Sequence, residues 1–217
     1  MPRADVKICG IATATDYDVC AEAGARWVGM VFFPKSPRHL SRDAAAALAN
    51  HADSYVDDSP KRVVLTVDMG DDALDDVMHA TRPDLVQLHG NETPDRAKAI
   101  KARFNVPIIK AIRIGTASDL DSCSVWDNVA DWLLLDAKSD SGDMPGGTGH
   151  SFDWSLLANY AGKTNWMLAG GLNPDKVAKA ISVTGARALD VSSGVESSPG
   201  KKDHRLIRSF IRAAEIG

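Results

Sequence analysis

Short apolar runs alternate along the whole chain with longer stretches in which apolar residues recur at helical spacing. The short runs predict eight β-strands, over Val6–Cys9, Trp27–Phe33, Arg62–Val67, Leu85–His89, Pro107–Ile112, Trp132–Asp136, Asn165–Ala169 and Ala188–Ser192. The longer stretches predict helices over Thr15–Ala23, Arg42–His51, Asp71–Ala80, Pro94–Phe104, Ala117–Asn128, Asp153–Tyr160, Pro174–Thr184 and His204–Glu215. Regular alternation of strand and helix is typical of α/β proteins with a parallel sheet.

Several of the predicted helices begin with residues that cap a helix. Threonines precede the first helix, and Ser41 precedes the alanine-rich second one, where a hydroxyl oxygen can accept from free backbone N–H groups. Thr93 is followed by Pro94, and proline is favoured at the first helical position. Asp71 provides a negative charge that suits a helix N-terminus. These residues support the predicted boundaries.

Eight strands, each followed by a helix, are the number needed for a (β/α)8 TIM barrel. We therefore predict one barrel domain over residues 1–217. A doubly wound sheet is the alternative, because it is built from the same local units. The count of eight and the absence of an early Gly-x-Gly-x-x-Gly favour the barrel, and no linker marks a second domain.

Composition is that of an ordinary globular protein, with 44% apolar and 25% charged residues. Lys and Arg are scattered and the net charge is −4, so neither nucleic acid nor an anionic membrane is an expected partner. No apolar run approaches the roughly 20 residues that span a bilayer, and no signal peptide is apparent. The three cysteines, Cys9, Cys20 and Cys123, are too few for a disulfide framework or a zinc site. We expect a cytoplasmic protein.

Polar residues gather at the C-terminal ends of the predicted strands, where barrel enzymes keep their chemistry. They are Cys9, His89, Asp136 and Asp190. Strand side chains alternate between faces, so Cys9 shares a face with Lys7, and His89 shares one with Gln87. We expect this polar face to line the barrel and the apolar face to meet the helices.

Glycine-rich loops follow three of the last strands. Backbone N–H groups in such loops and at helix starts attract anions, and glycine allows the backbone to approach closely. Together the loops predict one phosphate-bearing ligand, in agreement with the common barrel phosphate site after the last two strands. The candidate phosphate-binding residues are Gly146, Gly147, Gly170, Gly171, Ser192, Ser193 and Gly194.

Eight sequence blocks, in order along the chain, carry a resemblance to a known family. They are Val6–Ile11, Gly29–Phe32 with Ser36–Arg38, Val86–Glu92, Leu134–Asp136, Gly146–Trp154, Leu168–Leu172, Leu189–Glu196 and Pro199–Asp203. Through them the chain resembles the phosphoribosylanthranilate isomerases, single-domain (β/α)8 barrels of the tryptophan pathway. Ala12 and Lys176 depart from the residues usual in the family, and neither bears on the proposed chemistry.

The resemblance implies an aldose–ketose isomerase that performs an Amadori rearrangement on a sugar phosphate without metal or cofactor. Asp136 is implied as the general acid that protonates the furanose ring oxygen, and Cys9 as the general base that takes the C2′ proton. Arg38 is implied to bind the anthranilate carboxylate, His89 to line the site, and Asp190 to contact a sugar hydroxyl or order a loop.

Elementary chemistry is compatible with the two catalytic roles. Burial at an apolar strand end favours the protonated form of a carboxyl, as a general acid requires. A model thiol titrates near about 8.5, so Cys9 would be helped by nearby positive charge, which Lys7 on the same face could supply. The first strand ends in Cys9 rather than an aspartate, so we expect activity on the anthranilate substrate and none on the related histidine-pathway aminoaldose.

Other interpretations remain open from sequence alone. Cys9 could be inert packing, Asp136 a loop cap, His89 a core histidine and Arg38 a surface ion-pair residue. Indole-glycerol-phosphate synthase chemistry would need a lysine acid, either Lys7 or Lys110. A metal-dependent epimerase would need converging ligands, and a phosphate-binding protein without activity would need neither catalytic group. Sequence leaves open whether the barrel is a monomer or a homodimer.

Overall fold

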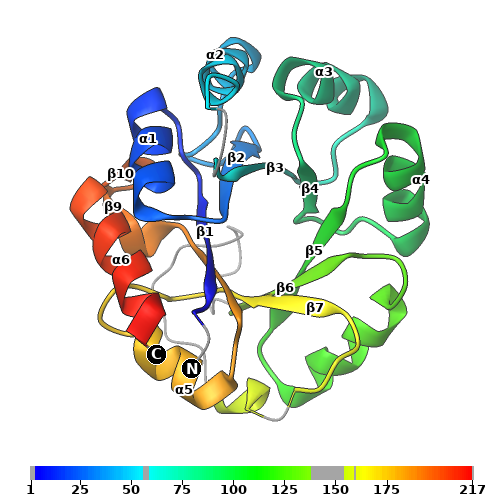
Figure 1. The fold of residues 1–217 in the computed structure, drawn as a ribbon. Helices are drawn as coiled ribbons and strands as arrows, with labels where there is room; N and C mark the ends of the chain where they lie inside the picture. Colours follow the sequence, from blue (N-terminus) through cyan, green and yellow to red (C-terminus); the bar gives the residue numbers. More distant parts are fainter. Residues whose placement is uncertain (1–2, 56–58, 138–153, 159, 217) are drawn as a thin grey trace.

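Eight parallel strands close into a barrel in the computed structural model of the chain, with helices packed around the outside (Figure 1). The structure describes residues 3–55, 59–137, 154–158 and 160–216. The strands are β1 (Asp5–Cys9), β2 (Trp27–Phe32), β3 (Lys61–Thr66), β4 (Leu85–Leu88), β5 (Ile108–Ile114), β6 (Trp132–Ala137), β7 (Asn165–Leu168) and β8 (Ala188–Val191). Each strand pairs with the next, and β8 pairs with β1. The predicted TIM barrel is confirmed, and the doubly wound sheet is excluded.

Six α-helices are present in the described residues. They are α1 (Ala14–Ala23), α2 (Arg42–Ala52), α3 (Asp71–Thr81), α4 (Pro94–Phe104), α5 (Val177–Thr184) and α6 (His204–Ile216). The capping predictions are confirmed: the Thr13, Ser41 and Thr93 side chains each accept a hydrogen bond from a backbone N–H in the first turn. No helix in the described part of the chain is long and apolar enough to cross a membrane.

Two predicted α-helices are wrong. The stretch after β5 is instead a 3₁₀ helix, η1 (Ala117–Trp126), and the stretch before β7 contains the short 3₁₀ helix η2 (Trp154–Leu157). In η1 the Ser122 and Ser124 hydroxyls donate to carbonyls three residues back, so these side chains compete for groups that an α-helix would use. Asp153, the predicted start of the second helix, lies outside the described residues.

A short segment after β8 forms regular structure that the sequence pattern does not predict. It contains the 3₁₀ turn η3 (Ser193–Val195) and a hairpin of β9 (Glu196–Ser198) with β10 (Lys201–Lys202). These elements are too short for apolar periodicity to reveal them. They lie at the C-terminal ends of the strands, so they help to build the site.

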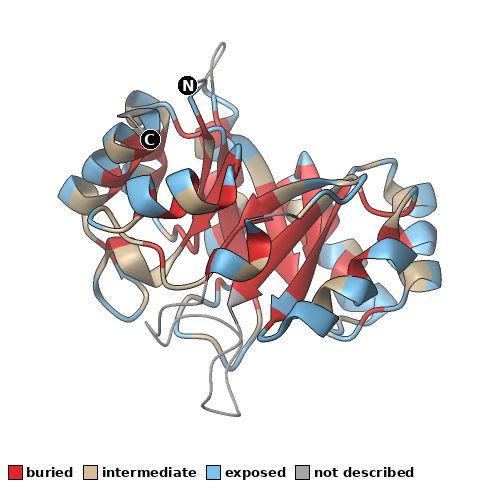
Figure 2. Cartoon of the chain, turned by 90° about the horizontal axis from the view of Figure 1, so that it is seen from below, coloured by how far each residue is buried: buried red, intermediate tan, exposed pale blue. Residues whose placement is uncertain are grey.

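Alternating strand residues divide the core into two regions. Residues facing inward fill the barrel, and the larger set facing outward packs against the helices, so that the strands are buried along their length (Figure 2). The inward set comprises Trp27, Val63, Leu85, Ile109, Ala111, Leu134, Met167, Ala169 and Ala188. Cys9, Val31 and Leu65 form a further inward cluster. The barrel is therefore a packed core that ends in a polar layer at its C-terminal mouth.

Candidate active site

One cavity at the C-terminal mouth of the barrel brings together every predicted site residue that the structure describes. Its lining includes Cys9, Arg38, His89, Gly170, Gly171, Asp136, Asp190, Ser192, Ser193 and Gly194. Gly146 and Gly147 lie outside the described residues. Apolar side chains from β2 and β3 and the segments that follow them, among them Phe33 and Leu65, complete the wall. The cavity thus combines an apolar side with several ionisable groups.

Cys9 ends β1 and faces the barrel interior, where it is 4% exposed. Burial raises the pKa of its thiol, and the positive charges of Lys7 and Lys202 oppose that rise without cancelling it. The positive charge of Lys7 therefore lowers the pKa of Cys9 as expected, but the rise caused by burial is larger. The negative charge of Asp190 also raises the pKa of Cys9.

Lys7 and Asp190 form a buried ion pair across the junction of β1 and β8. Their Cα atoms are paired in the strand register, and Lys7 Nζ lies 2.7 Å from Asp190 Oδ1. Burial works to lower the pKa of Lys7, but the charge of Asp190 and that of Cys9 raise it above its usual value. Lys7 is thus held as a cation beneath the Cys9 thiol, and Asp190 is the residue that keeps it there.

Asp136 lies on β6, where the side chains of Leu134 and Asp136 face inward and Leu135 faces the helices. It is 6% exposed. Its Oδ2 atom lies 3.7 Å from Nε2 of His89, which follows β4. On its other side, the His89 ring contacts the buried side chain of Gln87, with Gln87 Nε2 2.8 Å from His89 Nδ1. The carboxyl of Asp136, the imidazole of His89 and the amide of Gln87 are therefore successive neighbours, from the cavity into the barrel.

Arg38 is held at the cavity by Glu196. Its Nε and Nη2 donate to the two carboxylate oxygens of Glu196 at 2.7 and 2.8 Å, the paired geometry that suits arginine and a carboxylate. Burial opposes the charge on Arg38, but hydrogen bonding to Glu196 raises the pKa of Arg38 above its usual range. The Arg38 backbone N–H also donates to Ser36 Oγ, which fixes the turn that carries it.

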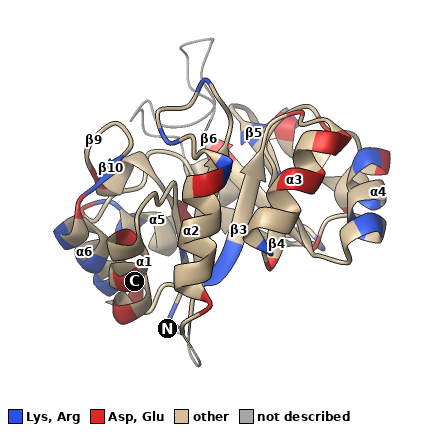
Figure 3. Cartoon of the chain, turned by 90° about the horizontal axis from the view of Figure 1, so that it is seen from above, with Lys and Arg blue, Asp and Glu red and all other residues tan. Residues whose placement is uncertain are grey.

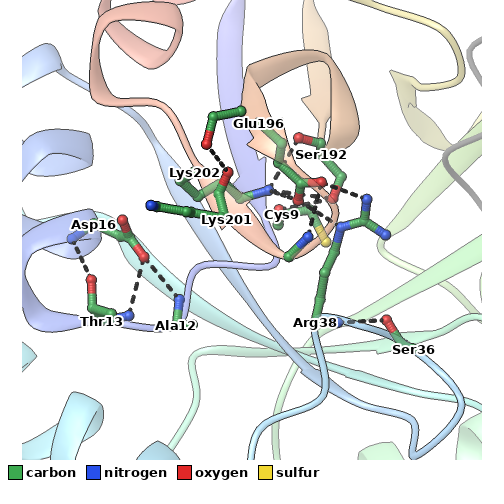
Figure 4. A network of polar contacts seen from close by, with 12 residues as sticks. Cys9, Ala12, Thr13, Asp16, Ser36, Arg38, Ser192, Glu196, Lys201 and Lys202 are labelled. Atoms are coloured by element: carbon green, nitrogen blue, oxygen red, sulfur yellow. Dashed lines mark hydrogen bonds and ion pairs between the residues drawn. The ribbon is translucent and has the colours of Figure 1, made fainter.

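Lys202 joins this ion pair from the β9–β10 hairpin (Figure 4). Its Nζ lies 2.8 Å from Glu196 Oε1 and donates to the Ser192 carbonyl at 3.1 Å. Burial lowers the pKa of Lys202, although Glu196 opposes that effect. For Glu196, burial raises the pKa, but Arg38 and Lys202 together lower it below its usual value.

The sequence analysis missed Glu196 and Lys202 as site residues, although both lie in the blocks that carry the family resemblance. The available indication was a Pro-Gly turn flanked by charged residues, directly after the predicted phosphate loop. That pattern alone more often belongs to a solvated surface loop. Contacts with Arg38 that span 158 residues of sequence are not visible from local patterns.

The loops after β7 and β8 pack tightly on each other. Gly170 and Gly171 have φ angles of 90° and 64°, values that favour glycine. A Cβ atom on Gly194 would lie 1.8 Å from the Leu172 carbonyl oxygen, so only glycine fits there. Ser192 Oγ donates to the Cys9 carbonyl at 3.0 Å and ties this loop to β1. Two glycine-containing loops that pack together, with the ammonium group of Lys202 nearby, are suited to binding an anion.

Ligand sets for a metal ion are absent from the residues that the structure describes: nowhere among them do three or more His, Cys, Asp or Glu side chains converge in a way that could hold one. The two lysines considered as alternative acids, Lys7 and Lys110, are both bound to other groups. Lys7 is paired with Asp190, and Lys110 donates to Glu92 at 2.9 Å and lies over the Trp126 ring. Neither lysine lines the cavity that contains Cys9 and Asp136.

Comparison with known proteins agrees with this geometry. A family model described as N-(5'-phosphoribosyl)anthranilate (PRA) isomerase matches residues 6–213. The N-(5'-phosphoribosyl)anthranilate isomerase of Parvibaculum lavamentivorans is 49% identical over 213 residues, which cover 97% of each chain.

Solved structures are similar over almost the whole chain. Phosphoribosyl anthranilate isomerase from Thermotoga maritima has a TM-score of 0.87 and 35% identity, covering 99% of this chain and 100% of that one. A phosphoribosyl anthranilate isomerase in complex with reduced 1-(o-carboxyphenylamino)-1-deoxyribulose 5-phosphate has a TM-score of 0.84 and 34% identity, with the same coverage. Monomers derived from the dimeric Thermotoga maritima enzyme have a TM-score of 0.83 and 34% identity, again with that coverage.

Proposed function

Because the chain belongs to the N-(5'-phosphoribosyl)anthranilate isomerase family, we propose that it converts N-(5'-phosphoribosyl)anthranilate to 1-(2-carboxyphenylamino)-1-deoxyribulose 5-phosphate. This is an aldose–ketose isomerisation in tryptophan biosynthesis. One observation carries the proposal: a thiol from β1 and a carboxyl from β6 line a single cavity that also contains Arg38 and the glycine loops. These groups match the acid, the base, the side chain that binds the substrate carboxylate and the phosphate-binding site that the reaction needs.

The first chemical step is assigned to Asp136. Its carboxyl donates a proton to the furanose ring oxygen, and the C1′–O bond breaks as the nitrogen lone pair forms a C=N bond. The product is an open-chain protonated Schiff base with a hydroxyl where the ring oxygen was. The place of Asp136 on the cavity wall supports this role, because its carboxyl faces the space where the sugar ring would bind.

The second step is assigned to Cys9 in its thiolate form. It takes the C2′ proton, and the electron pair left behind forms the C1′=C2′ bond and neutralises the iminium nitrogen. The resulting enolamine tautomerises to the ketone as C1′ gains a proton and the C2′ hydroxyl loses one, so the product is an isomer of the substrate. Since burial raises the pKa of Cys9, only a minor fraction of the enzyme is in the reactive form at neutral pH.

Substrate binding is assigned to Arg38 and to the loops after β7 and β8, which all line the cavity. The outer edge of the Arg38 guanidinium would pair with the anthranilate carboxylate, while Glu196 holds its inner edge. The phosphate would occupy the loops at Gly170–Gly171 and Ser192–Gly194, together with Gly146 and Gly147, where the ammonium of Lys202 adds positive charge. Asp190 would act mainly by ordering Lys7, and His89 by contact with Asp136.

Three broader expectations belong to the same proposal. Closure of all eight strands into one barrel supports a single domain over residues 1–217. Acidic residues predominate on α3 and basic residues on α4 and α6 (Figure 3), so both signs of charge lie on the outer helices, which supports a small-molecule substrate rather than nucleic acid. We propose a cytoplasmic enzyme that acts as a monomer or a homodimer and requires no metal or cofactor.

The function is tested by mixing the protein with freshly made phosphoribosylanthranilate in a buffer that contains a chelator. We expect the anthranilate fluorescence of the substrate to decay at a rate proportional to enzyme concentration. Absence of decay above the spontaneous rate would refute the proposed activity. Turnover of the histidine-pathway aminoaldose would instead refute the restriction to the anthranilate substrate.

A further inference from the structure

Gln87 is a fully buried polar residue in the barrel interior that the proposed reaction does not use. It lies on β4 between Leu85, in the apolar interior cluster, and His89, at the cavity. Gln87 is 0% exposed, and its Nε2 atom contacts Nδ1 of His89 at 2.8 Å. Among the described residues, Gln87 is the only hydrogen-bond partner of the His89 ring.

The direction of this hydrogen bond determines which nitrogen of a neutral His89 ring carries the proton. In the structure the amide nitrogen of Gln87 faces Nδ1, while its Oε1 is buried without a partner. An amide nitrogen can only donate, so with this amide orientation Nδ1 of His89 accepts and carries no proton. A neutral imidazole has one N–H, which must then be at Nε2. Gln87 therefore selects one of the two tautomers of His89.

The Nε2 atom of His89 points toward the proposed acid. It is buried without a hydrogen-bond partner, and Oδ2 of Asp136 lies 3.7 Å away. That separation is too long for a hydrogen bond. Catalytic hydrogen bonds are often long without substrate and shorten in the reacting complex. A buried donor beside a reacting carboxyl is thus available when charge develops there.

We propose that Gln87 is a positioning residue, which keeps the Nε2–H group of His89 directed at Asp136. The inference rests on the proposed function, in which Asp136 gives its proton to the sugar ring oxygen. The carboxylate that remains then accepts a hydrogen bond from Nε2–H, and His89 itself transfers no proton. In the opposite tautomer a bare Nε2 would accept from the Asp136 carboxyl and compete with the sugar for its proton.

Other charged groups around His89 do not replace this role. They lie on the walls of the two cavities that His89 lines, and comprise Cys9, Arg38, Asp68, Glu92, Lys110, Arg113 and Asp190. The nearest of them in sequence, Glu92, is paired with Lys110 at 2.9 Å. In the described residues none of these groups is hydrogen-bonded to the His89 ring, so Gln87 alone selects the tautomer.

The test uses histidine labelled with ¹⁵N and long-range ¹H–¹⁵N correlation spectra, with the His89 signals identified by their loss in His89→Gln. We expect the Nε2–H tautomer in the wild type. Gln87→Glu keeps the shape and, when its carboxyl is ionised, offers only acceptor oxygens, so Nδ1 should become protonated. We expect kcat to fall about 10- to 100-fold with KM nearly unchanged, the size of one hydrogen bond to a charged group.

Two further variants separate positioning from damage to the fold. Gln87→Met removes the amide altogether and should give mixed tautomers and a similar loss of kcat. Leu88→Met changes the next residue of β4, which faces the helices, and should leave both the His89 spectrum and kcat unchanged.

Either an Nδ1–H tautomer in the wild type, or wild-type kcat in both Gln87 variants, would overturn the inference. If the wild type fails to turn over phosphoribosylanthranilate, the proposed function fails. The spectra would still decide whether Gln87 sets the tautomer.

Discussion

The surroundings of Cys9 disfavour the thiolate, which is the form in which Cys9 would act as a base. Burial raises the pKa of its thiol, and the surrounding charges act in both directions, with Lys7 and Lys202 favouring the thiolate and Asp190 opposing it. A cysteine in such a place is usually inert packing. Here three cationic side chains, those of Lys7, Lys202 and Arg38, interact electrostatically with the thiol, which distinguishes it from the other buried cysteines.

The contribution of Lys202 can be measured from the pH dependence of the reaction. Cys9 acts as a base, so kcat/KM should rise with pH as the thiol loses its proton. Lys202→Met removes a charge that favours the thiolate, so this rise should move to higher pH by roughly one unit. Lys201→Met is the matched control, because the neighbouring Lys201 is exposed on the same hairpin. A profile that shifts downward, or equally in both variants, would contradict this view of Cys9.

At the scale of elements, the β9–β10 hairpin fastens the mouth of the barrel. Glu196 on β9 binds Arg38 from the segment after β2, while Lys202 on β10 binds the loop after β8. The hairpin turn also packs on the Arg38 turn, since a Cβ on Gly200 would lie 2.5 Å from the Pro37 carbonyl oxygen. Two loops that bind the substrate in the proposed function are thus joined through a short β-element.

Removing the Glu196 charge should therefore lower the free energy of unfolding. Glu196→Gln leaves Arg38 and Lys202 as cations without their shared partner, and such loss typically costs about 3–5 kcal/mol for buried pairs. Urea unfolding monitored by circular dichroism measures this, and KM should rise as Arg38 loses its position. Glu215→Gln breaks an exposed pair with Arg3 and should cost only about 0–1 kcal/mol. Equal stability of the two variants would mean that the hairpin does not fasten the site.

The contact between the loops after β7 and β8 gives a separate prediction. In Gly194→Ala the new methyl group would meet the Leu172 carbonyl, so the two loops must move apart. If they bind the phosphate together, KM should increase at least about 10-fold, the equivalent of roughly 1.4 kcal/mol of binding. Gly70→Ala, where nothing lies within 4 Å, should leave KM unchanged. Unchanged KM in Gly194→Ala would place the phosphate elsewhere.

At the scale of the whole molecule, sequence predicts the barrel well because its evidence is local. Each strand is marked by a short apolar run, and the regular recurrence of such runs predicts eight strands, a number that favours the closed barrel found in the structure. Predicted strand ends agree with the structure to within two residues, so the sequence alone places Cys9 and Asp136 at the mouth of the barrel.

The parts that sequence could not predict depend on contacts between distant residues. Arg38 meets Glu196 across 158 positions, and Lys7 meets Asp190 across 183, so no local pattern reveals either pair. The pKa of Cys9 depends on the balance between burial and several nearby charges, and both are defined only in the folded barrel. The 3₁₀ helix η1 shows the remaining weakness, because serine side chains there override an apparently helical stretch.

Closure of the barrel brings β1 and β6 to one cavity, where Cys9 and Asp136 act as base and acid in the proposed reaction. The most direct measurement is kcat on freshly made phosphoribosylanthranilate for Cys9→Ala and Asp136→Asn, with Cys20→Ala as a buried control outside the cavity. We predict that each of the first two variants folds and loses about 10²–10⁴-fold in kcat, while the control keeps wild-type turnover. Turnover near the wild-type level in either folded variant would contradict the assignment of that residue.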